Sequence, residues 1–264
     1  MKHKKVIAGI LLITLIPLLS AENALSARQI VEQAYEVIKL SGIEAVSEMI
    51  IIDKKGNKRV REVAQVSKLC DGGNTEKRLI RFLSPADVKG TSLLTFDYED
   101  KPDDIWLFMP ALRKTRRIVS SEKSKRFMGS EFSYADMSPP PLDDFKFTLL
   151  GEENVGEIPC WKIEIVPVTE DIEYENGFSK KISYFGKEDL VIRKSVYYDT
   201  DEELEKTLIV KKVQEVDTVN HKYRPVHMVM VNIQNGRSSI LMIKQIKFNP
   251  EVKDEYFSIE YLER

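Results

Sequence analysis

Few side chains in this sequence have the types and spacing that catalysis or metal binding requires. The chain after residue 24 has two histidines, His221 and His227, and neither has a second metal ligand at the i+2 or i+4 spacing. The adjacent carboxylates at 103–104 would point to opposite faces of a strand, which does not suit a shared acid–base site. The Gly129-Ser130-Glu131 sequence fits a capped turn better than a nucleophile, because no base accompanies the serine at a set spacing. We therefore expect no metal, no cofactor and no enzymatic activity.

The two cysteines, Cys70 and Cys160, allow either one disulfide or two separate thiols. They lie 90 residues apart, and neither belongs to a CxxC motif or a Cys/His cluster, which argues against thiol redox chemistry and structural zinc. An oxidising compartment would permit a bond between them. Nothing local shows that the two side chains meet, so both alternatives stay open.

The strongest signal for binding comes from residues 104–134. Residues 105–109, IWLFM, have no polar face, so as a strand they need cover on both sides. If 110–112 forms a tight turn, the basic run that follows makes the second arm of a hairpin. The side chains that would contact hydrocarbon are Leu94, Phe96, Trp106, Phe108, Phe127, Met128 and Phe132, and those that would face a head group, membrane or acidic partner are Arg113, Arg116 and Arg117.

The same hairpin has a simpler interpretation. A buried core strand followed by an edge strand guarded by Lys and Arg gives the same pattern. Composition alone favours this interpretation over an amphiphile-binding surface.

The elements that must position these residues follow from the hydrophobic pattern. Ser26 and Gln29 form a capping box, and the apolar spacing predicts a helix from Ser26 to Ser41 that Gly42 ends in a left-handed turn. After it, a dozen or so strands are predicted, with hairpin turns at 175–177 and 235–236. Their ranges are 43–52, 58–69, 77–84, 91–98, 104–109, 113–119, 145–151, 158–168, 180–187, 190–198, 204–213, 226–234 and 237–248. The result is a mainly β protein with a large antiparallel sheet, and sheets of that size curl.

Composition bounds the size and the partners of the protein. The chain has 264 residues, of which 42% are hydrophobic, and no repeat or Gly/Ser linker marks a boundary. We expect one domain over residues 25–264 and a monomer. The formal net charge is −2 and the basic residues concentrate at 113–126, so a general nucleic-acid binder is excluded.

Residues 1–24 have the pattern of an export signal. Three lysines precede an apolar stretch from Val6 to Leu19, and small residues follow it. The apolar stretch is short for a membrane span, and no cysteine lies near it, so the lipobox of a bacterial lipoprotein is missing. We expect a signal peptide over 1–24 and an exported, periplasmic protein.

Three ordered blocks of this sequence resemble one family. They are RFLSPADVKGTSLLTFDY (81–98), DDIWLFMPALRKTRRI (103–118) and FMGSEFSYADM (127–137). Together they resemble the LolA-like outer-membrane lipoprotein-sorting proteins, in the broader branch of the LolA/LolB superfamily. The looser likeness continues through the strand at Gly151-Glu152 and the strands at 163–167 and 193–198.

The resemblance implies an unclosed antiparallel β-barrel, or half-barrel, closed by a helical plug or lid and lined by apolar side chains. It implies a periplasmic carrier that holds acyl chains of a lipoprotein or lipid and ferries them toward the outer membrane. The partners would then be an inner-membrane transporter and an outer-membrane acceptor. The alternative is a sensor or interaction module of the same fold, which docks an acidic partner such as a membrane regulator or an RND-type exporter.

Overall fold

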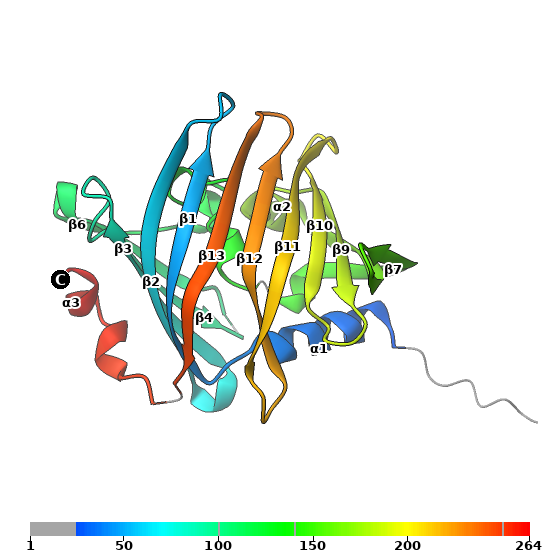
Figure 1. The fold of residues 1–264 in the computed structure, drawn as a ribbon, viewed down its shortest axis with the longest axis horizontal. Coiled ribbons are helices and arrows are strands. Elements are labelled where there is room, and N and C mark those ends of the chain that lie inside the picture. Colours follow the sequence, from blue (N-terminus) through cyan, green and yellow to red (C-terminus); the bar gives the residue numbers. More distant parts are fainter. Residues whose placement is uncertain (1–24, 100, 140, 250) are drawn as a thin grey trace, which may run out of the picture.

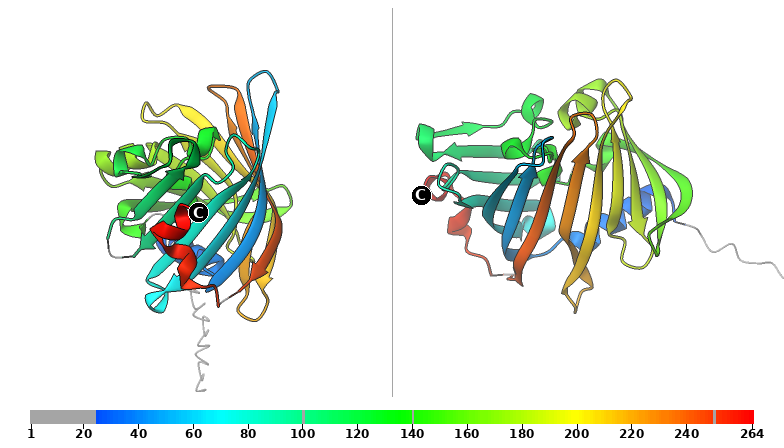
Figure 2. Two further views of the ribbon diagram at one scale, coloured as in Figure 1. Left: turned by 90° about the vertical axis from the view of Figure 1, so that its left-hand side faces the viewer. Right: turned by 45° about the horizontal axis from the view of Figure 1, so that its top comes forward.

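The computed structural model describes residues 25–264 apart from 100, 140 and 250, so the expected signal peptide lies outside the described residues. Its strands form one antiparallel sheet in the order β6-β5-β4-β3-β2-β1-β13-β12-β11-β10-β9-β8-β7. Strands β6 and β7 are its two edges, and the sheet curls without closing (Figures 1 and 2). The predicted unclosed, mainly β fold is confirmed.

The strands lie where the alternating pattern predicts them. Their bounds are β1 Gly42–Ile52, β2 Lys58–Cys70, β3 Thr75–Ser84, β4 Ser92–Tyr98, β5 Asp104–Met109, β6 Lys114–Arg117, β7 Phe145–Val155, β8 Ile158–Pro167, β9 Lys180–Gly186, β10 Ile192–Tyr198, β11 Leu204–Asp217, β12 Lys222–Asn232 and β13 Arg237–Phe248. The largest differences are in β7 and at the β11–β12 hairpin, where each strand runs about four residues further than predicted because polar residues continue the ladder.

Helix α1, Ala27–Ile38, begins at the predicted capping box. Ser26 accepts from the Gln29 N–H, and the Gln29 side chain accepts from the Ser26 N–H. The predicted end at Gly42 is wrong, because the chain becomes extended at Lys39 and Gly42 already begins β1. The apolar stripe of α1 is buried against the sheet, with Ile30 and Val31 0% exposed. No helix of the described residues is long and apolar enough to cross a membrane.

The predicted hairpin turn at 175–177 is also wrong. A short helix, α2 Glu170–Asn176, occupies this position, and Gly177 ends it with a φ of 71°. Thr169 caps its N-terminus by accepting from the Ile172 N–H. Gly177 does have the left-handed conformation that a turn requires, but a left-handed glycine ends a helix as readily as it forms a hairpin turn.

Two segments outside the sheet cover its two faces. Residues 119–144, here called the crossing segment, join edge strand β6 to edge strand β7 behind the sheet in the view of Figure 1. This segment is a chain of short 3₁₀ turns, as at Phe127–Gly129 and Ala135–Met137. Residues 251–264, here called the C-terminal segment, contain the short helix α3, Ile259–Leu262, and pack on the opposite face of β3 and β4 (Figure 2).

Candidate functional site

The concave face of the sheet carries two large apolar clusters. One joins the apolar stripe of α1 to residues of β7–β12, and its buried members include Ile30, Phe132, Phe145, Ile163, Phe178, Phe185 and Met230. The other joins residues of β1–β5 to the crossing segment, and its buried members include Met49, Phe82, Leu93, Ile105, Leu107, Phe127 and Tyr134. Met137 and Leu241 pack against both. The concave face is therefore one continuous apolar surface that the chain's own side chains fill.

The crossing segment contacts this surface without joining the sheet. From 119 to 143, every backbone–backbone hydrogen bond of the described residues stays inside the segment, as between the Phe127 N–H and the Phe132 carbonyl. Its isolated β-bridge, Arg126 to Ser133, is internal as well. Elements bonded to a sheet only through side chains open at a lower cost than strands of the ladder. The crossing segment can therefore act as a lid that opens without breaking the sheet.

Glu131 provides the first anchor of this lid. Its side chain is buried, with Oε1 2.7 Å from Arg237 Nε and Oε2 3.1 Å from Asn235 Nδ2. Its backbone N–H donates to Ser239 Oγ at 2.9 Å. The serine beside it, Ser130, donates to the carbonyl of Phe127 at 2.8 Å, so this sequence forms the capped turn expected above.

Asp136 provides the second anchor. Its Oδ2 accepts from the Ser133 N–H (2.8 Å) and lies 3.3 Å from Lys206 Nζ, and its Oδ1 accepts from the Tyr197 hydroxyl at 3.4 Å. Burial raises the pKa of Asp136, but Lys206 and the Ser133 donors outweigh burial and hold it below the ordinary value. The lid is therefore fixed to β10 and β11 by a half-buried carboxylate that stays ionised.

Arg78 of β3 provides the third anchor, because it donates to the carbonyl of Met137. The same guanidinium lies 2.9 Å from Glu76 Oε2 and 3.6 Å from Asp97 Oδ2. Burial raises the pKa of Asp97 to about 7, and the more distant Arg78 compensates only in part. Neither Asp97 oxygen has a hydrogen-bond partner among the described residues, nor has the nearby Ser138 hydroxyl.

The seven predicted hydrocarbon-contacting residues do not lie on one face. Phe127, Met128 and Phe132 belong to the lid and pack onto the concave clusters. The other four face the outer side, where they pack with the C-terminal segment: Leu94, Phe96, Trp106 and Phe108. The reason is strand alternation, since successive side chains of β4 and β5 point to opposite faces.

The predicted site does not include the inward residues of the same strands. Leu93, Ile105 and Leu107 are each at most 3% exposed and face the lid. The predicted site also omits the opposite half of the sheet, where Ile163 and Met230 form the floor beneath α1. A usable signal was the alternation around Ile163 and Ile165 in β8, where polar residues separate the inward positions.

The predicted basic residues are largely paired within the chain. Arg116 Nη1 lies 2.7 Å from Glu122 Oε2, and Arg117 pairs with Asp104. Arg113 is exposed at the left-handed end of the predicted β5–β6 turn, with a φ of 47°. The three arginines do not form one unpaired patch, because Arg116 points to the opposite face of β6 from Arg117.

The thiols and histidines stay apart from one another. Cys70 and Cys160 are both free, so the disulfide alternative is not realised, and six strands separate β2 from β8 in the sheet. His221 is exposed beside Glu215, while His227 pairs with Met242 within the sheet. Across the described range of the chain, no group of three His, Cys, Asp or Glu side chains could hold a metal ion.

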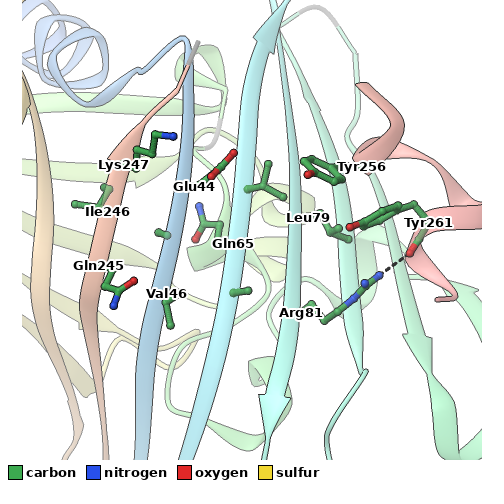
Figure 3. Close-up of a pocket in the computed structure, with 13 residues that line it drawn as sticks. Glu44, Val46, Gln65, Leu79, Arg81, Gln245, Ile246, Lys247, Tyr256 and Tyr261 are labelled. Atoms are coloured by element: carbon green, nitrogen blue, oxygen red, sulfur yellow. Dashed lines mark hydrogen bonds between the residues drawn. The ribbon is translucent and has the colours of Figure 1, made fainter. Parts of the chain in front are cut away.

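A hollow of about 570 Å³ lies on the outer face, away from the lid (Figure 3). Its floor consists of residues of β13, β1, β2 and β3, and Tyr256 and Tyr261 of the C-terminal segment line one side. Arg81 reaches from β3 to the backbone carbonyl of Tyr261, which fixes that side.

Comparisons with known proteins agree with this architecture. A family model described as that of an uncharacterized protein matches residues 74–264. A crystal structure of a domain from Vibrio parahaemolyticus, named for outer membrane lipoprotein sorting, is 27% identical, with a TM-score of 0.82 over 90% of this chain and 98% of that one. No curated protein matches the chain.

Two further solved structures have the same fold. A DUF1329 family protein from Desulfovibrio piger is 26% identical, with a TM-score of 0.82 over 89% of this chain and 97% of that one. A LolA superfamily protein from Nitrosomonas europaea is 18% identical, with a TM-score of 0.68 over 90% of this chain and all of that one, and supports the fold alone. The chain therefore belongs to the family of uncharacterized proteins whose model matches residues 74–264, and it shares its fold with the outer-membrane lipoprotein-sorting, DUF1329 and LolA superfamily structures to which it is similar.

Proposed function

We propose that this protein is a periplasmic carrier that holds the acyl chains of a lipoprotein or lipid on the concave face and ferries them toward the outer membrane. The observation that carries the proposal is the lid. A continuous apolar surface lies under α1 and a segment whose described backbone makes no backbone–backbone hydrogen bond to the strands and is bonded to them only through side chains of the sheet. Opening the lid would expose this surface to an acyl chain.

The energetics of exchange suit a carrier. Sheltering about 14 methylenes could stabilise the complex by up to about 11 kcal/mol, which would hinder release if nothing replaced the tail. Here the lid and α1 refill the surface with Phe127, Phe132 and Ile30 when no tail is present. Contacts between the tail and the surface are then exchanged for contacts between the lid and the surface. The net free energy of binding is therefore small enough to allow both binding and release.

The cellular setting belongs to the same proposal. The export signal expected at 1–24 would deliver the mature chain, residues 25–264, to the periplasm as a single domain. The Vibrio parahaemolyticus relative is itself named for outer membrane lipoprotein sorting, which supports an inner-membrane donor and an outer-membrane acceptor for this chain. The alternative of a docking module for an acidic partner has less support, because Arg116 and Arg117 are already paired.

The two tryptophans report on the two faces and allow a direct test. Trp161 packs at the edge of the concave cluster, whereas Trp106 lies in the outer cluster. Palmitate brominated along its chain quenches a tryptophan that it contacts. We expect quenching in the Trp106→Phe variant, which retains Trp161, and little in Trp161→Phe.

Native mass spectrometry of the unmodified protein provides the companion measurement and should show one bound lipid. Quenching confined to Trp106 would move the ligand to the outer hollow. Absence of quenching in both variants, with no bound lipid in the mass spectrum, would contradict the carrier function.

A further inference from the structure

Three neighbouring strands place two lysines and a tyrosine in one row on the concave face. Tyr197 of β10 pairs with Lys181 of β9 on one side and with Lys206 of β11 on the other. The two ammonium nitrogens lie 5.3 and 5.0 Å from the centre of the Tyr197 ring. Tyr197 also belongs to the apolar cluster under α1. A pair of cations therefore stands at the border of the surface proposed to hold hydrocarbon.

This row has more positive than negative charge. Asp136 of the lid forms the one ion pair that the described residues make with it, through Lys206 at 3.3 Å. Lys181 has no ion-pair partner among the same residues and lies over the ring of Phe178 at 5.0 Å. Burial lowers the pKa of Lys181 to about 8, and Asp136 opposes this only in part. A half-buried ammonium without its own counter-ion is unfavourable for the fold, which is typical of positions kept for binding.

The carboxylate in this row comes from the lid and not from the sheet. When the lid moves away, Asp136 leaves with it, and Lys181, Lys206 and the Tyr197 hydroxyl lose their anionic partner. We propose that this row is an anion site, which takes the carboxylate or phosphate head group of an anionic amphiphile in place of Asp136. The inference rests on the carrier function proposed above and names the chemical class of its ligand.

The number of positive charges in the row supports an anionic head group. Two ammonium groups and one phenol beside an apolar floor match one anionic head attached to a hydrocarbon tail. A neutral or zwitterionic head would leave the buried Lys206 and the half-buried Lys181 without a partner, which is costly. The site therefore disfavours amphiphiles whose head group is neutral or zwitterionic.

Matched probes test the head-group preference. The protein is titrated with fluorescently labelled palmitate and with the methyl ester of the same probe, near neutral pH. We expect the acid to bind about tenfold to a hundredfold more tightly, as one or two charge-assisted hydrogen bonds would give. Inorganic phosphate should not displace the acid, because the tail supplies most of the affinity.

Variants assign that preference to the row. Lys181→Met, which removes a cation without an ion-pair partner, and the double variant Asp136→Asn/Lys206→Met, which removes both members of the one ion pair, should each bring the acid close to the affinity of the ester. Lys194→Met is the matched control, because Lys194 lies on the outer face of the same strand as Tyr197 and should keep the preference. Thermal unfolding of each variant checks that it is folded.

The outcomes separate this inference from the carrier function. Equal binding of acid and ester, or a preference that survives in both row variants, would overturn the anion site while the carrier stands. Binding of neither probe would overturn the carrier function. Displacement of the acid by millimolar inorganic phosphate would show a site for free anions and would also overturn the amphiphile inference.

Discussion

Strands β4 and β5 present alternate residues to the inner and the outer face of the sheet. These two faces are covered in different ways. Inward, Leu93 and Leu107 pack under the crossing segment, and outward, Leu94 and Trp106 pack under the C-terminal segment. The inner cover is fixed by buried charged groups, among them Glu131. The outer cover is fixed mainly by apolar and aromatic contacts. A cover held by a few polar anchors can exchange with a polar ligand, whereas one held by apolar contacts is a permanent part of the core.

The outer cover should therefore give the largest loss of stability when it is disrupted. Leu262 of the C-terminal segment is 0% exposed, and Arg81 donates to its backbone carbonyl. Leu262→Asp would bury a carboxylate without a partner and should lower the free energy of unfolding by more than about 4 kcal/mol. Urea unfolding measures this loss. Tyr256→Phe is the control, since it keeps the ring. A variant as stable as wild type would mean that the outer cover is not part of the core.

Disruption of the inner cover should have a smaller effect on stability and a visible effect on the lid. Glu131→Ala leaves Arg237 without its buried carboxylate and should cost about 2–4 kcal/mol. Hydrogen exchange should accelerate across residues 119–144 and not in β1 or β2. Glu153→Ala, at an exposed pair with Lys162, should leave the free energy of unfolding nearly unchanged. Acceleration spread evenly over the sheet would show that the segment does not open on its own.

The polar cluster behind the lid makes the inner cover sensitive to pH. The pKa of Asp97 is raised to about 7 when folded, because burial disfavours its charge. The unfolded carboxyl ionises at lower pH, so the free energy of unfolding should fall as pH rises from about 4 to about 7, by at most about 4 kcal/mol. Arg78, Glu76, Asp103 and Ser138 surround this group.

The Asp97→Asn variant isolates this effect. An amide cannot ionise, so the variant should have a flatter profile of stability against pH over the same range. Urea unfolding at several pH values measures both proteins. Parallel profiles for the variant and the wild type would assign the pH dependence to other groups.

The sequence predicted the sheet well because each strand carries its own local signal. Alternation around Ile163 and the Asn235-Gly236 turn needs no knowledge of the rest of the chain. The face of each residue in 105–109 could not be predicted, since five apolar residues in succession have no polar side to mark the direction. Pairing with Leu93 and Leu94 decides it, and pairing is a long-range property.

The charged residues of the candidate site were hidden for the same reason. In the sequence, Lys181 and Lys206 read as solvated strand positions, and Asp136 lies in a short stretch of helical signal at 132–138, outside the predicted strands. They meet because β9, β10 and β11 place them in register and the lid crosses above them. The C-terminal segment was missed because its helix is one turn long, too short for a periodic signal.

Substitution in the basic hairpin should have the smallest effect on stability and binding, although the sequence predicted a binding surface there. Arg117 is exposed and its partner Asp104 is at the surface, so Arg117→Ala should change the free energy of unfolding by about 0–1 kcal/mol. The affinity for labelled palmitate should be unchanged within about twofold, because the substitution alters no residue of the lid or of the row around Tyr197. Lys181→Met serves as the comparison in the same titration. If Arg117→Ala weakened binding more than Lys181→Met does, the head group would lie at the outer edge of the sheet and the contrast between the two covers would be reversed.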